Sequence, residues 1–359
     1  MINSKHTANP PILQVKNLRV DFPSSRGKVR ILEGVHFSLY PGEILALVGE
    51  TGCGKSVTAK SILDLLPQVG VNRDGVVDFD GCDLINLSNA AMRLFRGRRI
   101  AMIFQNPQSS INPVFTLGEQ IFRLIRMYLS DEVQTFQQRL KCSGRKAVRQ
   151  IAKEKLEEVG LTDAERLLKA YAHQISGGMA QRYRIATALL SSPEVLIADE
   201  ATSALDVTVQ AHILKLLRSM CRRKGTAIVF ITHDLGIAAQ MCDRVAVMYS
   251  GRIVETAPTL SIFETPRHPY TQGLLAAVPR LGSGERLANI PGMIPDLANP
   301  PAGCRFHPRC PHVMACCKME KPPEQDIGKQ HQVACYLYGQ NVSDLPTDPS
   351  RQPQGISFE

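Results

Sequence analysis

The chain has 359 residues, of which 44% are hydrophobic and 21% are charged. A chain of this length and composition can bury one large or two smaller cores, which excludes a wholly disordered, fibrous or low-complexity protein. No apolar run approaches the roughly 20 residues that a transmembrane helix needs. The first residues also lack the features of a signal peptide. We therefore expect a protein that stays in the cytoplasm.

The formal net charge of +9 allows either a solvated basic surface or a groove for nucleic acid. Basic residues cluster at 93–99 and, with helical spacing, at 141–155. Aromatic residues that stack on bases are not interleaved with them. The charge pattern therefore favours a solvated surface, and we expect no nucleic-acid partner.

Short apolar runs alternate with amphipathic stretches between residues 13 and 251, which predicts an α/β fold with a largely parallel sheet. The clearest predicted strands are 44–48, 195–198 and 227–232. Polar or glycine-rich residues follow these strands, and the carboxyl ends of parallel strands meet at one edge of a sheet. Residues 116–172 have helical periodicity and many charges, which predicts a helical subdomain.

A phosphate-binding loop is predicted at residues 49–56, where GETGCGKS follows a strand and precedes a helix. Glycines let backbone N–H groups approach phosphates, Lys55 can reach the β- and γ-phosphates, and Ser56 can bind Mg²⁺. The predicted nucleotide-binding residues here are Gly49, Glu50, Thr51, Gly52, Cys53, Gly54, Lys55, Ser56 and Val57.

Two carboxylates follow the predicted strand at 195–198. Asp199 can hold Mg²⁺, and Glu200 can orient and polarise an attacking water. Gln105 and His233 also follow apolar runs, so we expect them near the same sheet edge. The segment ISGGMAQR, which starts at residue 175, indicates either a second anion-binding helix terminus or a plain helix cap.

These motifs, in this order, resemble an ABC-type nucleotide-binding domain of the P-loop class, with a RecA-like core sheet and a helical subdomain. The resemblance covers about residues 13–251. It implies ATP and Mg²⁺ as ligands and a head-to-tail dimer with a homologous ATPase subunit, in which each ATP is shared. The implied roles are the catalytic base for Glu200, a γ-phosphate contact for His233, sensing of Mg²⁺ and the membrane subunit for Gln105, contacts to the partner's ATP for Ser176, Gly177 and Gly178, and the dimer-spanning loop for Asp206.

Some positions depart from that family's pattern or stay open. Ala201 replaces a proline, which we expect to loosen the turn after Glu200. Cys53 stands where serine is commoner, and near a helix N-terminus we expect a lowered thiol pKa and reactivity toward thiol reagents. Phe22 resembles the aromatic residue that stacks on adenine, although a core phenylalanine is an equal alternative.

The segment after Pro258 resembles the C-terminal extension of ATPases that serve oligopeptide and dipeptide importers, with nickel systems as relatives. The family spacing is matched by Cys304, Cys310, Cys317 and Cys335. By this resemblance they bind a 4Fe-4S cluster. Tetrahedral zinc and plain reduced thiols remain alternatives.

The resulting expectation is an ATP-hydrolysing importer subunit on the cytoplasmic face of the inner membrane, below two permease subunits and supplied by a solute-binding protein. Its substrate is a dipeptide or oligopeptide, or alternatively nickel or another small solute. A soluble ABC ATPase acting on ribosomes or DNA, and a regulator without turnover, are the rival classes. The expected divisions are an arm (1–12), the nucleotide-binding domain (13–257, with the helical subdomain at about 116–172), the Cys-rich extension (258–342) and a disordered tail (343–359).

Overall fold

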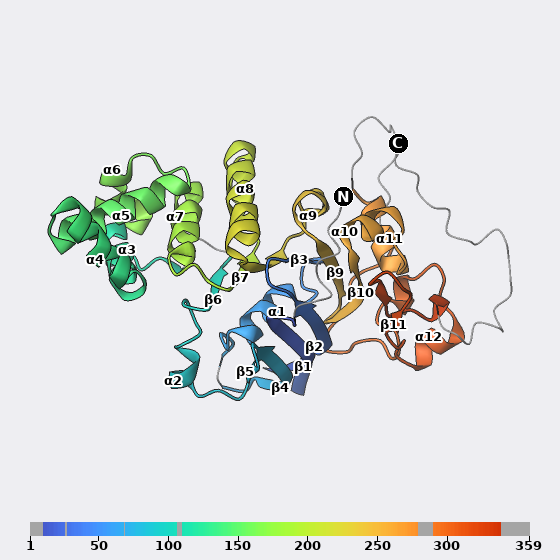
Figure 1. The fold of residues 1–359 in the computed structure, drawn as a ribbon. Helices are drawn as coiled ribbons and strands as arrows, with labels where there is room; N and C mark the ends of the chain where they lie inside the picture. Colours follow the sequence, from blue (N-terminus) through green and yellow to red (C-terminus); the bar gives the residue numbers. More distant parts are fainter. Residues whose placement is uncertain (1–9, 26, 68, 106–109, 279–289, 339–359) are drawn as a thin grey trace. The chain divides into compact units, whose positions relative to one another are not determined.

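The computed structural model describes residues 10–25, 27–67, 69–105, 110–278 and 290–338 (Figure 1). The predicted disordered tail and most of the predicted N-terminal arm lie outside these ranges. The chain divides into two compact units. Among the described residues, the first contains 40–43 and 87–229, and the second contains 10–39, 44–86 and 230–338. Among the described residues, no helix has both the length and the apolar character needed to cross a membrane.

The first unit contains a parallel strand pair, β6 (Ile100–Ile103) and β7 (Val195–Asp199), with Ile100 opposite Val195. Every residue of both strands is buried, as expected for strands covered on both faces. Strand β8 (Ala227–Ile231) begins in this unit, where the Ile228 N–H donates to the Glu43 carbonyl at 2.8 Å.

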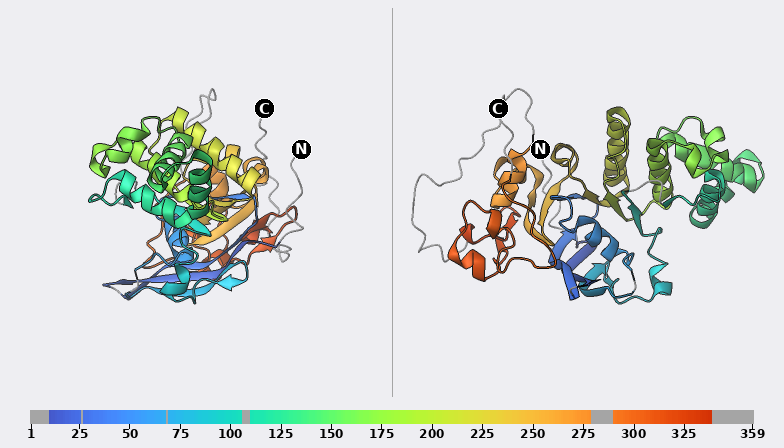
Figure 2. Two further views of the ribbon diagram at one scale, coloured as in Figure 1. Left: turned by 60° about the vertical axis from the view of Figure 1, so that its left-hand side comes forward. Right: turned by 180° about the vertical axis from the view of Figure 1, so that it is seen from behind.

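Helices make up the rest of this unit, and α3 to α7 pack on one another (Figure 2). Helix α3 begins at a capping box in which Thr116 and Glu119 satisfy each other's backbone N–H groups. It buries Leu117, Ile121 and Ile125, which recur every four residues on one face. The helices are α2 (Asn89–Met92), α3 (Leu117–Tyr128), α4 (Ser130–Leu140), α5 (Gly144–Glu158), α6 (Ala164–Lys169), α7 (Gly177–Leu189) and α8 (Val207–Lys224).

The second unit contains an antiparallel sheet in the order β2-β1-β4-β5. Its strands are β1 (Leu13–Ser24), β2 (Gly27–Leu39), β4 (Asn72–Phe79) and β5 (Cys82–Asp83). The expectation of one largely parallel sheet is wrong for this region. Much of β1 and β2 alternates between buried and more exposed residues, as is typical of an antiparallel sheet with one face exposed to solvent.

The same unit contains β3 (Ile44–Val48), which pairs in parallel with β9 (Arg244–Tyr249). Strand β10 (Arg252–Pro258) runs antiparallel to β9, and its other edge pairs with β12 (Gln332–Val333), which pairs with β11 (Gln325–Asp326). The C-terminal segment thus adds strands to the sheet that carries β3. The helices are α1 (Lys55–Ile62), α9 (Leu235–Met241), α10 (Thr259–Glu264), α11 (Pro269–Ala276) and α12 (Ala315–Met319).

The three clearest strand predictions are confirmed as β3, β7 and β8, with shifts of at most one residue at their ends. Each is a continuous buried run that ends next to a predicted site segment.

Candidate functional site

The phosphate-binding loop lies between β3 and α1 and depends on its glycines. A Cβ at Gly49, whose φ is 151°, would lie 2.1 Å from the Met248 carbonyl oxygen. Gly54, with φ 111°, provides the left-handed cap that starts α1. The buried Lys55 ammonium donates to the carbonyls of Gly49 (2.7 Å) and Glu50 (3.0 Å). Backbone donors and an ammonium at a helix N-terminus form a site suited to phosphate.

The expectation of a reactive Cys53 is wrong. Its side chain is 1% exposed, and burial raises the pKa of the thiol. The Lys55 ammonium, 3.7 Å from Sγ, acts in the opposite direction but is outweighed. A buried, protonated thiol reacts slowly, because the thiolate is the nucleophile.

The carboxylates of the first unit lie at the end of β7. Asp199 is buried, and Glu200 follows with a φ of 48°, the left-handed region that non-glycine residues rarely adopt. Gln105 Nε2 donates to Glu200 Oε2 at 2.7 Å, so two predicted site residues 95 positions apart are in contact. Strained backbone of this kind concentrates at functional sites.

Hydrogen bonds hold the turn after Glu200 even though Ala201 stands in place of proline. The Ser203 N–H and hydroxyl both donate to the Glu200 carbonyl, at 3.3 and 3.0 Å. Gln181 Nε2, from α7, donates to the Ala201 carbonyl at 2.6 Å in a buried position. The turn that carries Glu200 is therefore tied directly to the helix that follows the ISGG segment.

Ser176 caps helix α7, and its hydroxyl accepts from the Met179 N–H at 3.2 Å. A Cβ at Gly178 would lie 3.6 Å from the Ala204 carbonyl, so the helix start adjoins the segment before Asp206. Asp206 caps α8 by accepting from the Val209 N–H at 3.0 Å. Ser176 is thus a helix cap, and it is exposed at the N-terminus of a 13-residue helix.

The remaining predicted nucleotide contacts lie in the second unit with the phosphate loop. Phe22 is half-buried on β1, opposite Val29 of β2. His233 is exposed directly after β8, next to Asp234, which caps α9. Asp199, Glu200, Gln105, Asp206 and the ISGG segment belong to the first unit.

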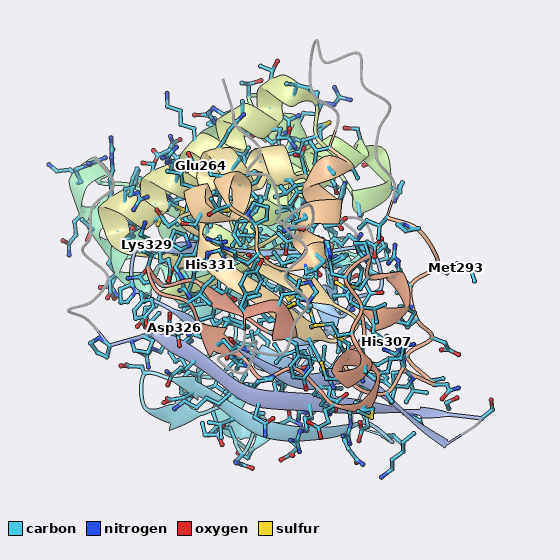
Figure 3. The ribbon with its side chains drawn as sticks, turned by 90° about the vertical axis from the view of Figure 1, so that its right-hand side faces the viewer. Glu264, Met293, His307, Asp326, Lys329 and His331 are labelled. Carbon is cyan, nitrogen blue, oxygen red and sulfur yellow. The ribbon has the colours of Figure 1, made fainter. Side chains whose placement is uncertain are left out.

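The four predicted cysteine ligands line one cavity of the second unit, together with His268, His307 (labelled in Figure 3) and Phe306. Burial raises the pKa of Cys310 to about 11 and that of Cys335 to about 12, so these thiols are protonated near neutral pH. In the part of the chain that the structure describes, no group of three or more His, Cys, Asp or Glu side chains could hold a metal ion. The four cysteines therefore lie around one cavity, but their side chains are not in positions that would bind a metal ion.

Two residues in contact with the phosphate loop were missed in the sequence. The Tyr270 hydroxyl accepts from the Glu50 N–H at 2.9 Å, and Arg309 donates to both carboxylate oxygens of Glu50, at 2.8 and 3.1 Å. This pairing raises the pKa of the Arg309 guanidinium. Neither residue belongs to a nucleotide-binding motif, and 220 and 259 positions separate them from Glu50.

Comparisons with known proteins identify two family regions. Residues 32–203 match the family described as ABC transporter, and residues 254–317 match the C-terminal region of oligopeptide and dipeptide transporters. The dipeptide transport ATP-binding protein of Bacillus subtilis is 45% identical, with 92% of this chain and 96% of that protein covered. A probable peptide ABC transporter ATP-binding protein of Sinorhizobium fredii is 46% identical, with 92% and 96% covered.

Solved structures share the cassette fold. A dimeric bacterial ABC transporter cassette matches with a TM-score of 0.59 and 26% identity, over 69% of this chain and 98% of that chain. A dimeric ATP-binding cassette in a post-hydrolysis state, bound to ADP and Pi, matches with a TM-score of 0.58 and 25% identity, over 69% and 98%.

Proposed function

We infer that the chain hydrolyses ATP to power the uptake of dipeptides or oligopeptides, because it belongs to the family of ABC transporter ATP-binding proteins. This inference rests mainly on the geometry of the two site segments. One is a glycine-dependent loop centred on Lys55, and the other is a strained Glu200 in contact with Gln105. The first suits phosphate binding, and the second suits the positioning of a water for hydrolysis.

The proposed site is completed by a second ATPase subunit. Residues 49–57 of the loop bind ATP, with Phe22 on adenine and His233 on the γ-phosphate. Ser56, Asp199 and Gln105 bind Mg²⁺. The start of α7, with the exposed Ser176 and the half-buried Gly177 and Gly178, then meets the ATP of the partner subunit. The dimeric cassettes among the similar solved structures support this arrangement. Mg²⁺ would supply charge neutralisation at the transferred phosphate.

We place the subunit on the cytoplasmic face of the inner membrane, bound to two permease subunits and indirectly to a solute-binding protein. The substrate class is supported by the names of the relatives and by the matched C-terminal region. Uptake of nickel or another small solute is the alternative, and transport assays of the assembled complex with labelled dipeptide and labelled nickel separate the two.

The catalytic proposal is tested by Glu200→Gln in the assembled complex. The amide keeps the shape of the side chain but cannot act as a base, so turnover should fall by about 100-fold or more. Separated from the permeases, the variant should also accumulate with its ATPase partner as an ATP-bound dimer, visible by size-exclusion chromatography. Glu165→Gln, which changes an exposed carboxylate paired with Arg149, is the matched control and should keep normal turnover. Unchanged ATPase activity in Glu200→Gln would reject the assignment.

The gathered cysteines support a second, separate proposal. We propose that Cys304, Cys310, Cys317 and Cys335 bind a 4Fe-4S cluster, with zinc as the alternative. Binding requires local rearrangement of these side chains and the release of thiol protons, because thiolates are the ligands. Anaerobic purification followed by iron, sulfide and zinc analysis should give about four iron atoms per chain. Zinc instead of iron selects the alternative, and neither metal in anaerobic protein rejects the site.

A further inference from the structure

We propose that Tyr270 and Arg309, both C-terminal to Pro258, are positioning residues of the phosphate-binding loop. They hold Glu50 so that the loop accepts ATP. The proposal rests on the ATP-hydrolysing function above and deepens it, because it assigns part of the nucleotide site to a segment outside the nucleotide-binding motifs. All the residues that carry it belong to the second unit.

The first contact fixes one peptide plane of the loop. The peptide between Gly49 and Glu50 donates its N–H to the Tyr270 hydroxyl at 2.9 Å, and its carbonyl accepts from Lys55 Nζ at 2.7 Å. The N–H and the carbonyl of a trans peptide point in opposite directions, so the two hydrogen bonds fix the orientation of this peptide from both sides. Tyr270 thereby orients the carbonyl that holds the phosphate-binding lysine.

The second contact neutralises a carboxylate inside the loop. Arg309 binds both oxygens of Glu50, and its own side chain is only 4% exposed. An unpaired carboxylate at this position would repel the triphosphate, and the repulsion is strong where water is partly excluded. A bidentate arginine removes the net charge and also fixes the direction of the side chain.

Arg309 and Tyr270 are themselves held rigidly. Arg309 donates from Nε to the Pro291 carbonyl at 3.0 Å and from Nη2 to the Ile290 carbonyl at 3.3 Å. The Tyr270 ring lies 4.6 Å from the Tyr249 ring and 5.4 Å from the Phe306 ring, measured between centroids. Side chains locked by packing and further hydrogen bonds can transmit a fixed geometry to the residue they contact.

The test measures steady-state ATP hydrolysis by the assembled complex. Arg309→Gln leaves the Glu50 charge uncompensated, so repulsion between Glu50 and the triphosphate should raise KM for ATP about tenfold, with little change in kcat. The defect should shrink at high salt, which screens the repulsion. Arg309→Lys should recover part of the affinity, and Tyr270→Phe should raise KM by a smaller factor.

A second substitution separates positioning from general stability. If Arg309 acts through Glu50, the double variant Glu50→Gln with Arg309→Gln should have a KM closer to that of the wild type than Arg309→Gln alone. Arg305→Gln is the matched control, because Arg305 is equally buried in the same segment but bonds Glu33 and the Ser250 carbonyl. It should lower thermal stability without raising KM.

Failure of the positioning role and failure of the proposed ATPase function give different results. A wild-type complex that hydrolyses no ATP rejects that function. A wild-type complex that hydrolyses ATP, together with an Arg309→Gln KM within twofold of its value, overturns the positioning role. An equal rise in KM for Arg305→Gln, or no rescue by Glu50→Gln, overturns it as well.

Discussion

His268 is a buried histidine that caps α11 only in its neutral form. It is 1% exposed, and burial lowers its pKa to about 4 even though Glu255 lies nearby and acts in the opposite direction. Its Nδ1 accepts from the Tyr270 N–H at 3.0 Å, which caps α11. A protonated imidazole has no lone pair to accept this bond. Proton uptake by His268 therefore opposes the start of the helix that carries Tyr270.

We predict that this residue makes the fold acid-sensitive. The folded pKa lies below the unfolded value, so the unfolded state binds the proton first. The stabilisation is complete above about pH 6.5 and is lost as the pH falls toward 4, by about 3 kcal/mol in total. Urea unfolding at a series of pH values measures the slope. His268→Asn can cap the helix without titrating, so it should flatten the slope in this range. Equal slopes for both proteins would contradict the prediction.

The chemical role of a residue can be predicted from the sequence where a motif determines it. It cannot be predicted where the packing of the folded chain determines it. The roles predicted for Gly49 and Lys55 follow from the loop pattern. In the structure a Cβ at Gly49 would meet the Met248 carbonyl, and the Lys55 ammonium donates to the Gly49 carbonyl. The burial of Cys53 does not follow from the pattern. A Cβ on Gly49 would lie 3.0 Å from its sulfur, so the thiol is enclosed by the fold of the loop itself. Helix-terminus arguments alone therefore gave the wrong sign for its pKa.

At the scale of elements, local pattern identified the buried strands and missed the pairings made at long range. Continuous apolar runs predicted β3, β7 and β8 because each is buried on both faces. Strands β11 and β12 have two residues each, too few for any periodicity. Strand β12 is positioned by pairing with β10, and β11 in turn pairs with β12. The side-chain contact between His331 and Glu255 of β10 spans 76 residues of sequence. The contacts between Glu50 and the C-terminal segment were missed for the same reason.

At the scale of the molecule, the second unit is assembled from three separate stretches of chain. The phosphate-binding loop comes from 44–86, and Tyr270 and Arg309 come from the described part of 230–338. Val333 of β12 is fully buried, and the neighbouring His331 bonds the buried Glu255 at 2.7 Å. Since elements that share a core unfold cooperatively, we expect the C-terminal segment and the loop to lose their structure together.

We predict that Val333→Asp weakens nucleotide binding although Val333 is not part of the loop. An unpaired carboxylate in a fully buried position should lower the melting midpoint by roughly 5–10 °C. The temperature at which ATP binding is lost should fall in parallel. Lys329→Asp, an exposed change in the β11–β12 connection at a left-handed position that aspartate tolerates, is the control and should leave both midpoints unchanged. Proteolytic release of the segment in Val333→Asp with ATP binding intact would show that the two parts are independent.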